Sequence, residues 1–145
     1  MACDALTDDG EFDKTREAIE KLAIVGRVTV PGWIDPVAFE ALLSQADILV
    51  LPSFDENLPL SVVGVFARGI VVICTPVGAL PDIVEPEVTG LVVQPDDVKR
   101  LVVTPDRLLG DAQLREPLGY NARALEERLN VEQYTVRLVE MWPQA

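Results

Sequence analysis

Four short runs of β-branched and aliphatic residues constrain this chain most, because a segment with helical spacing separates each run from the next. The runs are Val28–Val30, Ile48–Leu51, Val71–Cys74 and Leu91–Val93. Nearly continuous hydrophobicity of this length is typical of parallel strands that are covered on both faces. The alternation therefore predicts an α/β fold, a Rossmann-like parallel sheet of about four strands with helices on both faces.

The segments between the runs have the periodicity of helices. Asp13–Leu22 places its apolar side chains on one face, with charges opposite. Asp35 and Pro36 have the residue types of a helix N-cap and of the first helical position. Leu60–Arg68 is apolar almost all round, as expected for a helix buried against a sheet, and Gly69 is expected to end it.

The carboxy-terminal third is predicted to be helical. Asp96–Leu109 is expected to restart at Thr104-Pro105, because the threonine can cap a helix and the proline can begin one. Ala112–Leu129 contains Pro117 beyond its first turn, where the missing N–H predicts a kink or a break. A final amphipathic helix, capped by Asn130, is expected to follow.

Composition narrows the class of protein. The 145 residues carry 24 acidic and 12 basic side chains and no histidine, for a net charge of -12. This charge repels polyanions, so neither nucleic acid nor an anionic membrane surface is an expected partner. The longest apolar stretch, Leu60–Cys74, is interrupted and too short for a membrane span. The absence of histidine removes the commonest general base and the commonest metal ligand.

Length and cysteine use favour one domain in a reducing compartment. Residues 1–145 fit a single domain, with residues 1–10 as an irregular leader that is too charged for a signal peptide. The two cysteines, Cys3 and Cys74, lie far apart, and Cys74 ends an apolar run where a buried thiol is expected. A cytoplasmic protein without disulfides is the prediction.

Five segments in a fixed order carry a family resemblance. They are Arg27–Trp33, Leu42–Ser53, Phe54–Val62, Val77–Glu85 and Thr89–Val93. They resemble the carboxy-terminal, nucleotide-sugar-binding domain of retaining GT-B-type glycosyltransferases of group 1, and the resemblance extends over about residues 11–142. That family has two Rossmann-like domains with the site between them. The resemblance implies binding of a UDP-, GDP- or ADP-sugar, transfer with retention, no metal, and an acceptor domain that precedes this one.

The resemblance also implies a donor site after the run Ile48–Leu51. Ligands of open α/β sheets bind beyond the carboxyl ends of the strands. Glu56 matches the family's first donor-loop glutamate and is the implied catalytic residue, which would accept hydrogen bonds from sugar hydroxyls. Free amides at the start of the following helix would hold the diphosphate, and the turn at residues 32–34 would bind the base. The implied nucleotide-binding residues are Gly32, Trp33, Ile34, Asn57, Leu60, Ser61, Val62 and Gly64.

Each assignment has a structural alternative. Glu56 has the chemistry of a solvated loop carboxylate, Ser61 that of an early-helix residue, and Trp33 that of a cover for the sheet edge. Gly78 and Pro81 are expected to shape a turn and a helix start rather than the site wall. A two-carboxylate mechanism at Asp55-Glu56 is not expected, because adjacent loop side chains usually point apart.

The sequence departs from the family pattern at two donor-loop and helix positions, in its charge and in its topology. The family's second glutamate, which grips the ribose, falls on Gly64, and losing such a hydrogen bond costs about 1.5–3 kcal/mol. Asn57 replaces the usual glycine after the first glutamate, a milder change. No lysine or arginine occurs from Val28 to Ala67, although the family neutralises the diphosphate with cations. The family's first two strands also have no counterpart, so one edge of Ile48–Leu51 and both sides of Val28–Val30 are expected to lack partners. A repaired topology, a strand from another chain or a larger parent protein would supply them.

Two functions remain open. One is a nucleotide-sugar-binding domain of a glycosyltransferase; the other is an inactive relic or interaction module with the same fold. An unrelated Rossmann-type binder is disfavoured because no Gly-x-Gly-x-x-Gly motif follows a strand.

Overall fold

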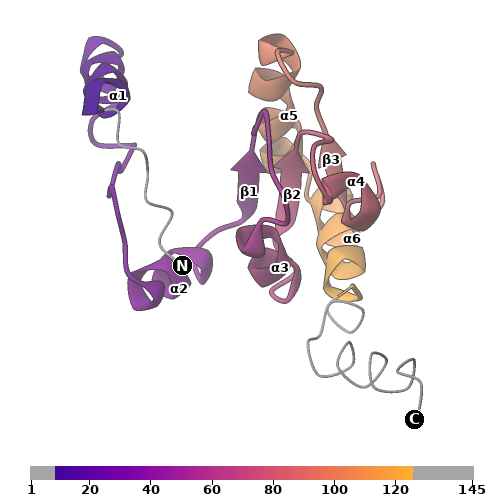
Figure 1. The fold of residues 1–145 in the computed structure, drawn as a ribbon. Coiled ribbons are helices and arrows are strands. Elements are labelled where there is room, and N and C mark those ends of the chain that lie inside the picture. Colours follow the sequence, from indigo (N-terminus) through magenta and orange to yellow (C-terminus); the bar gives the residue numbers. More distant parts are fainter. Residues whose placement is uncertain (1–8, 126–145) are drawn as a thin grey trace. The chain divides into compact units, whose positions relative to one another are not determined.

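The computed structural model describes residues 9–125, which divide into two compact units at residue 42 (Figure 1). Each unit is described by itself. The predicted final helix capped by Asn130 and the residues before Asp9 lie outside the described residues.

The first unit contains the helix α1 (Asp9–Lys21) and most of the helix α2 (Pro36–Leu43). In α1 an exposed ion pair joins Lys21 Nζ to Glu17 Oε2 at 3.1 Å. The predicted N-cap is confirmed, because the Ala38 amide donates to Asp35 Oδ1 at 2.8 Å. The turn before α2 contains Gly32, whose φ is +70°.

The predicted strand Val28–Val30 is wrong, since these residues have no strand structure. A β-branched run forms a strand only where a neighbouring strand completes its hydrogen-bond ladder, and the described part of this unit contains none. Val28 and Val30 instead line a groove of about 240 Å³ together with Ile19 of α1.

The second unit is built on a parallel sheet in the order β1 (Ile48–Leu51), β2 (Val71–Cys74), β3 (Gly90–Val92). The first two strands have the predicted bounds, and the third begins and ends one residue earlier than predicted. Register pairs Ile48 with Val71, and Val72 with Gly90. The described residues therefore contain three strands rather than about four, and β1 is an edge strand, as expected.

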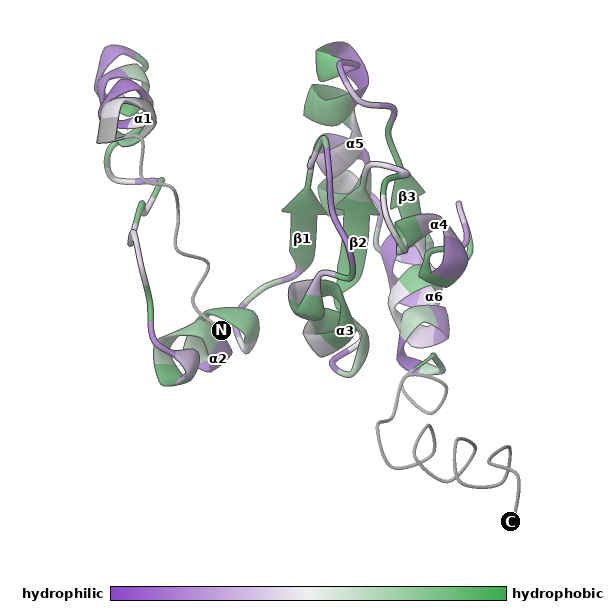
Figure 2. Cartoon of the chain, viewed as in Figure 1, coloured by the Kyte–Doolittle hydropathy of each residue, from purple (hydrophilic) through white to green (hydrophobic). Residues whose placement is uncertain are grey.

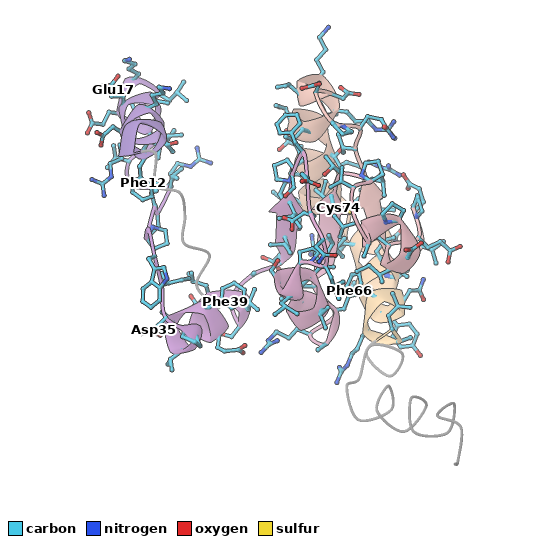
Figure 3. The ribbon with its side chains drawn as sticks, in the orientation of Figure 1. Phe12, Glu17, Asp35, Phe39, Phe66 and Cys74 are labelled. Atoms are coloured by element: carbon cyan, nitrogen blue, oxygen red, sulfur yellow. The ribbon has the colours of Figure 1, made fainter. Side chains whose placement is uncertain are left out.

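Helices cover both faces of this sheet. Val71 and Ile73 of β2 pack in one cluster with Leu91, Val93, Leu108 and Leu118, so α5 (Val98–Gly110) and α6 (Ala112–Arg123) cover that face. Side chains alternate along a strand, so Val72 and Cys74 point to the other face, and all of β2 is buried. The strands are hydrophobic along their whole length in Figure 2. Figure 3 shows Phe66 on α3 (Leu60–Phe66) and Cys74 on β2 in this unit.

The helix ends are partly as predicted. α3 ends at Phe66, two residues before the predicted end at Arg68, and Gly69 at φ +68° closes the turn that follows: its amide donates to Phe66 O and the next amide donates to Val65 O, a Schellman arrangement. The predicted restart at Thr104-Pro105 is wrong, because α5 is continuous and Thr104 Oγ1 donates to Arg100 O at 2.7 Å. No break occurs at Pro117 either, and α6 ends at Arg123. Packing of Leu108 and Leu118 on the sheet outweighs the local cost of each proline.

Candidate functional site

The loop between β1 and α3 carries Glu56 at the carboxyl edge of the sheet. The Ser53 hydroxyl donates to Glu56 Oε1 at 2.8 Å, and both side chains are half-buried. Glu56 is therefore held to its own loop rather than extended into solvent. The other carboxylate oxygen, Oε2, has no protein donor among the described hydrogen bonds and can accept a bond from a ligand.

Hydrogen bonds from the end of β2 hold the loop between β1 and α3 against the sheet. Thr75, only 3% exposed, directly follows β2, and its hydroxyl donates to Ser53 O. Its amide also donates to Leu51 O at 3.4 Å. Thr75, just after β2, is thus hydrogen-bonded to the last residue of β1 and to Ser53 in the loop that follows β1.

Gly78 packs against the backbone that carries Glu56. It has φ +56°, and a Cβ at this position would lie 2.0 Å from Glu56 O and 2.7 Å from Asn57 O. The next amide, that of Ala79, donates to Asn57 O at 2.8 Å. Only glycine allows both this φ and this close approach. Gly78 shapes a turn, and Pro81 lies in the first turn of α4 (Leu80–Ile83), as predicted.

The start of α3 differs from its predicted geometry. Three outward amides were expected, but the Val62 amide donates to Pro59 O at 3.0 Å and the Val62 side chain is wholly buried. The amides of Leu60 and Ser61 have no acceptor among the described residues, and the Leu60 side chain is 72% exposed. Two amides, rather than three, are available at this end of α3.

Gly64 leaves room where the family has its second glutamate. A Cβ built there would lie 3.6 Å from Leu43 Cδ1 and 3.9 Å from Arg68 Nη1, both ordinary contacts. Arg68 Nη1 donates to Gly64 O at 2.7 Å. The first cation after the cation-free stretch is thus bound to the backbone of α3.

The predicted base-binding turn lies in the first unit. Gly32 has a positive φ, Trp33 is 68% exposed and Ile34 is half-buried. The second unit therefore brings Glu56, Asn57 and Gly78 together, with Ser61 in the helix that follows. Residues 32–34 belong to the first unit.

Other features of the second unit do not form a chemical site. Burial raises the pKa of the Cys74 thiol to about 11, so this thiol stays protonated at neutral pH. A cavity of about 300 Å³ lies where residues 46–47 lead into β1 and Ile70 leads into β2, at the opposite end of the strands from Glu56. Two of its cations, Arg68 and Arg115, donate to the backbone oxygens of Gly64 and Leu108.

Residues 9–125 contain neither a cluster of metal-binding side chains nor a helix that could span a membrane. No group of three or more acidic, cysteine or histidine side chains lies close enough to hold a metal ion. No helix in the same range is long and apolar enough to cross a bilayer.

Ser53 and Thr75 were not predicted as site residues. The spacing Ser53-x-x-Glu56, which is that of a capping box, was the available signal for the first. The position of Thr75 just after a strand was the signal for the second.

Comparison with known proteins gives a consistent family. Residues 6–125 match the family model of glycosyl transferases group 1. A sulfoquinovosyl transferase of Arabidopsis thaliana is 27% identical over 146 residues, which cover 92% of this chain and 28% of that protein. The chain thus spans less than a third of the length of this curated relative.

Solved structures agree on the fold. Sucrose-phosphate synthase from Thermosynechococcus elongatus is 31% identical with a TM-score of 0.79, over 91% of this chain and 33% of that one. An Anabaena protein in complex with UDP has a TM-score of 0.80 at 18% identity, over 94% and 38% of the two chains. The parallel sheet with helices on both faces is the Rossmann-like fold of the GT-B enzymes. Because residues 6–125 of its 145 match the family model, this chain belongs to the glycosyl transferases group 1 family.

Proposed function

We propose that this chain is the nucleotide-sugar-binding domain of a retaining glycosyltransferase. The observation that carries this proposal is the placement of Glu56 at the carboxyl edge of the sheet, with one carboxylate oxygen free, in a member of this family. Sites of open α/β sheets lie at this edge. The Anabaena structure of similar fold holds UDP in one complex and UDP-glucose in another, which makes these the first ligands to test.

The proposed roles follow the geometry. Glu56 Oε2 accepts a hydrogen bond from a sugar hydroxyl. The amides of Leu60 and Ser61 donate to the diphosphate, and Asn57, in the loop before α3, contributes to the same site. Main-chain groups of Gly32-Trp33-Ile34 bind the base. The donor is bound without a metal, and the acceptor is bound by a further domain, because this chain spans only 28% of its Arabidopsis relative.

A second function, that of an inactive module, is favoured by one observation in particular. Gly64 supplies no carboxylate for the ribose, and Arg68 lies on its backbone oxygen rather than in the loop of Glu56. We propose that the chain by itself binds weakly and does not catalyse transfer, so that any catalysis depends on a partner domain.

Titration with UDP, GDP and ADP, followed by amide spectra, tests the proposal. Saturable shifts confined to residues 32–34 and 56–62 are expected for one nucleotide. EDTA should leave them unchanged. The absence of any shift at millimolar nucleotide would refute the donor-binding role and leave the inactive module.

A further inference from the structure

We propose that Ser53 is a positioning residue for the Glu56 carboxylate and that Thr75 fixes Ser53 in turn. This inference rests on the proposed function, in which Glu56 contacts the donor sugar. It adds two residues that do not themselves touch the donor. Their predicted effect is on the difference in affinity between a sugar nucleotide and the bare nucleotide.

The first step is the direction of the hydrogen bond. A serine hydroxyl has one proton, and Ser53 donates it to Glu56 Oε1 at 2.8 Å. Oε2 keeps its full acceptor capacity for a sugar hydroxyl, in a carboxylate plane that Ser53 has already fixed. Ser53 acts on the donor through Glu56.

The second step is the anchoring of Ser53 itself. The Thr75 hydroxyl donates to Ser53 O from a position 22 residues further along the chain, and Thr75 is buried. A loop of this kind would otherwise be free to change its backbone conformation. Thr75 therefore relates Ser53 to the end of β2 rather than only to its own loop.

The third step concerns the backbone of Glu56. Gly78 packs on Glu56 O, and the Ala79 amide holds Asn57 O at 2.8 Å. The segment that follows β2 thus fixes the main chain of Glu56, and Ser53 fixes its side chain. A carboxylate ordered before the donor arrives loses less rotamer freedom on binding.

A purely local role is the competing explanation. Ser53-x-x-Glu56 has capping-box spacing, and such a bond can stabilise a turn without affecting any ligand. In that case removal of the hydroxyl would shift loop amides but would not change the preference for a sugar nucleotide over the bare nucleotide.

The test starts from the free protein. Three-bond couplings that report χ1 of Glu56 should show one rotamer in the wild type and averaged values in Ser53→Ala. The matched variant Ser53→Thr, which keeps the hydroxyl, should retain one rotamer. Thr75→Val should loosen Glu56, and Thr75→Ser should not. Couplings that are already averaged in the wild type, or unchanged in Ser53→Ala, would overturn the proposal.

The second arm measures binding of UDP and UDP-glucose to the same variants. Ser53→Ala should leave the affinity for UDP unchanged and lower the advantage of UDP-glucose over UDP by about three- to tenfold. An equal loss for both ligands, or no loss, contradicts the positioning role. If neither ligand binds the wild type, the proposed function fails for UDP-sugars, whereas the couplings of Glu56 still decide whether Ser53 orders it.

Discussion

Replacing Gly64 by glutamate should strengthen nucleotide binding and stabilise the chain at the same time. The Cβ position meets only Leu43 Cδ1 at 3.6 Å and Arg68 Nη1 at 3.9 Å, so the backbone need not move. Glutamate in place of a mid-helix glycine gains about 0.5–1 kcal/mol. A Glu–Arg pair four residues apart, with Arg68, adds about 0.2–0.5 kcal/mol.

The effect on affinity is larger than the effect on stability. A restored carboxylate that accepts hydrogen bonds from the ribose is worth about 1.5–3 kcal/mol, or about tenfold to a hundredfold in Kd. Gly64→Ala is the matched control, because it gains the helix propensity without the carboxylate. Urea unfolding measures the first effect, and titration with UDP, GDP and ADP measures the second.

The control variants define what would refute this reasoning. Equal nucleotide affinity of Gly64→Glu and Gly64→Ala, both alone and combined with Arg68→Gln, would mean that residue 64 does not face the ribose, and the assignment of the donor site would be wrong. Because Arg68 lies close enough to pair with the new carboxylate, Gly64→Glu is also combined with Arg68→Gln. An affinity gain seen only in that double variant would show that Arg68 competes with the ligand.

Three further changes test the packing described above. Gly78→Ala should destabilise the chain by about 2 kcal/mol or more in urea unfolding, because its Cβ would lie 2.0 Å from Glu56 O, whereas Gly110→Ala, with nothing within 4 Å, should not. Cys74 has a pKa raised from 9.0 to about 11, so its contribution to stability is complete below pH 9 and is progressively lost as pH rises to 11; the wild type should lose about 2 kcal/mol more than Cys74→Ala over this range, and parallel pH curves would refute the burial argument. Pro105→Ala should raise stability by about 1–3 kcal/mol, since it restores an amide inside α5; a lower melting temperature would show that the half-buried ring packs better than alanine.

The sequence predicted the parts of the fold that depend on local pattern. β1 and β2 have their predicted bounds because four consecutive β-branched and aliphatic residues favour a strand of a parallel sheet. Val28–Val30 is a shorter run with Thr29 at its centre, and its described unit contains no neighbouring strand, on which strand formation depends. Thr104-Pro105 and Pro117 have the local features of helix breaks, yet the burial of Leu108 and Leu118 against the sheet keeps both helices continuous.

The candidate site was predictable in position but not in detail. Parallel strands bring their carboxyl ends to one edge, so the location of Glu56 beyond β1 followed from the order of elements. The bond from Ser53 to Glu56 depends on side-chain directions in an irregular loop, which no periodicity encodes. The approach of Gly78 to Glu56 joins residues 22 positions apart and required the register of β1 and β2.

Binding and bond cleavage place different demands on the charges of this chain. No cation occurs from Val28 to Ala67, and the described cations of the second unit that have assigned contacts are directed elsewhere: Arg107 pairs with Glu87 at 3.2 Å, and Arg115 donates to Leu108 O at 2.9 Å. A diphosphate bound near Glu56 would thus be held by neutral amides against a net charge of -12. At 0.1 M ionic strength, salt largely screens repulsion between exposed charges that lie more than about 10 Å apart. Nucleotide affinity should therefore rise with added NaCl. An affinity that falls with NaCl would show that a cation contacts the phosphates, and the leaving group could then be stabilised within this chain.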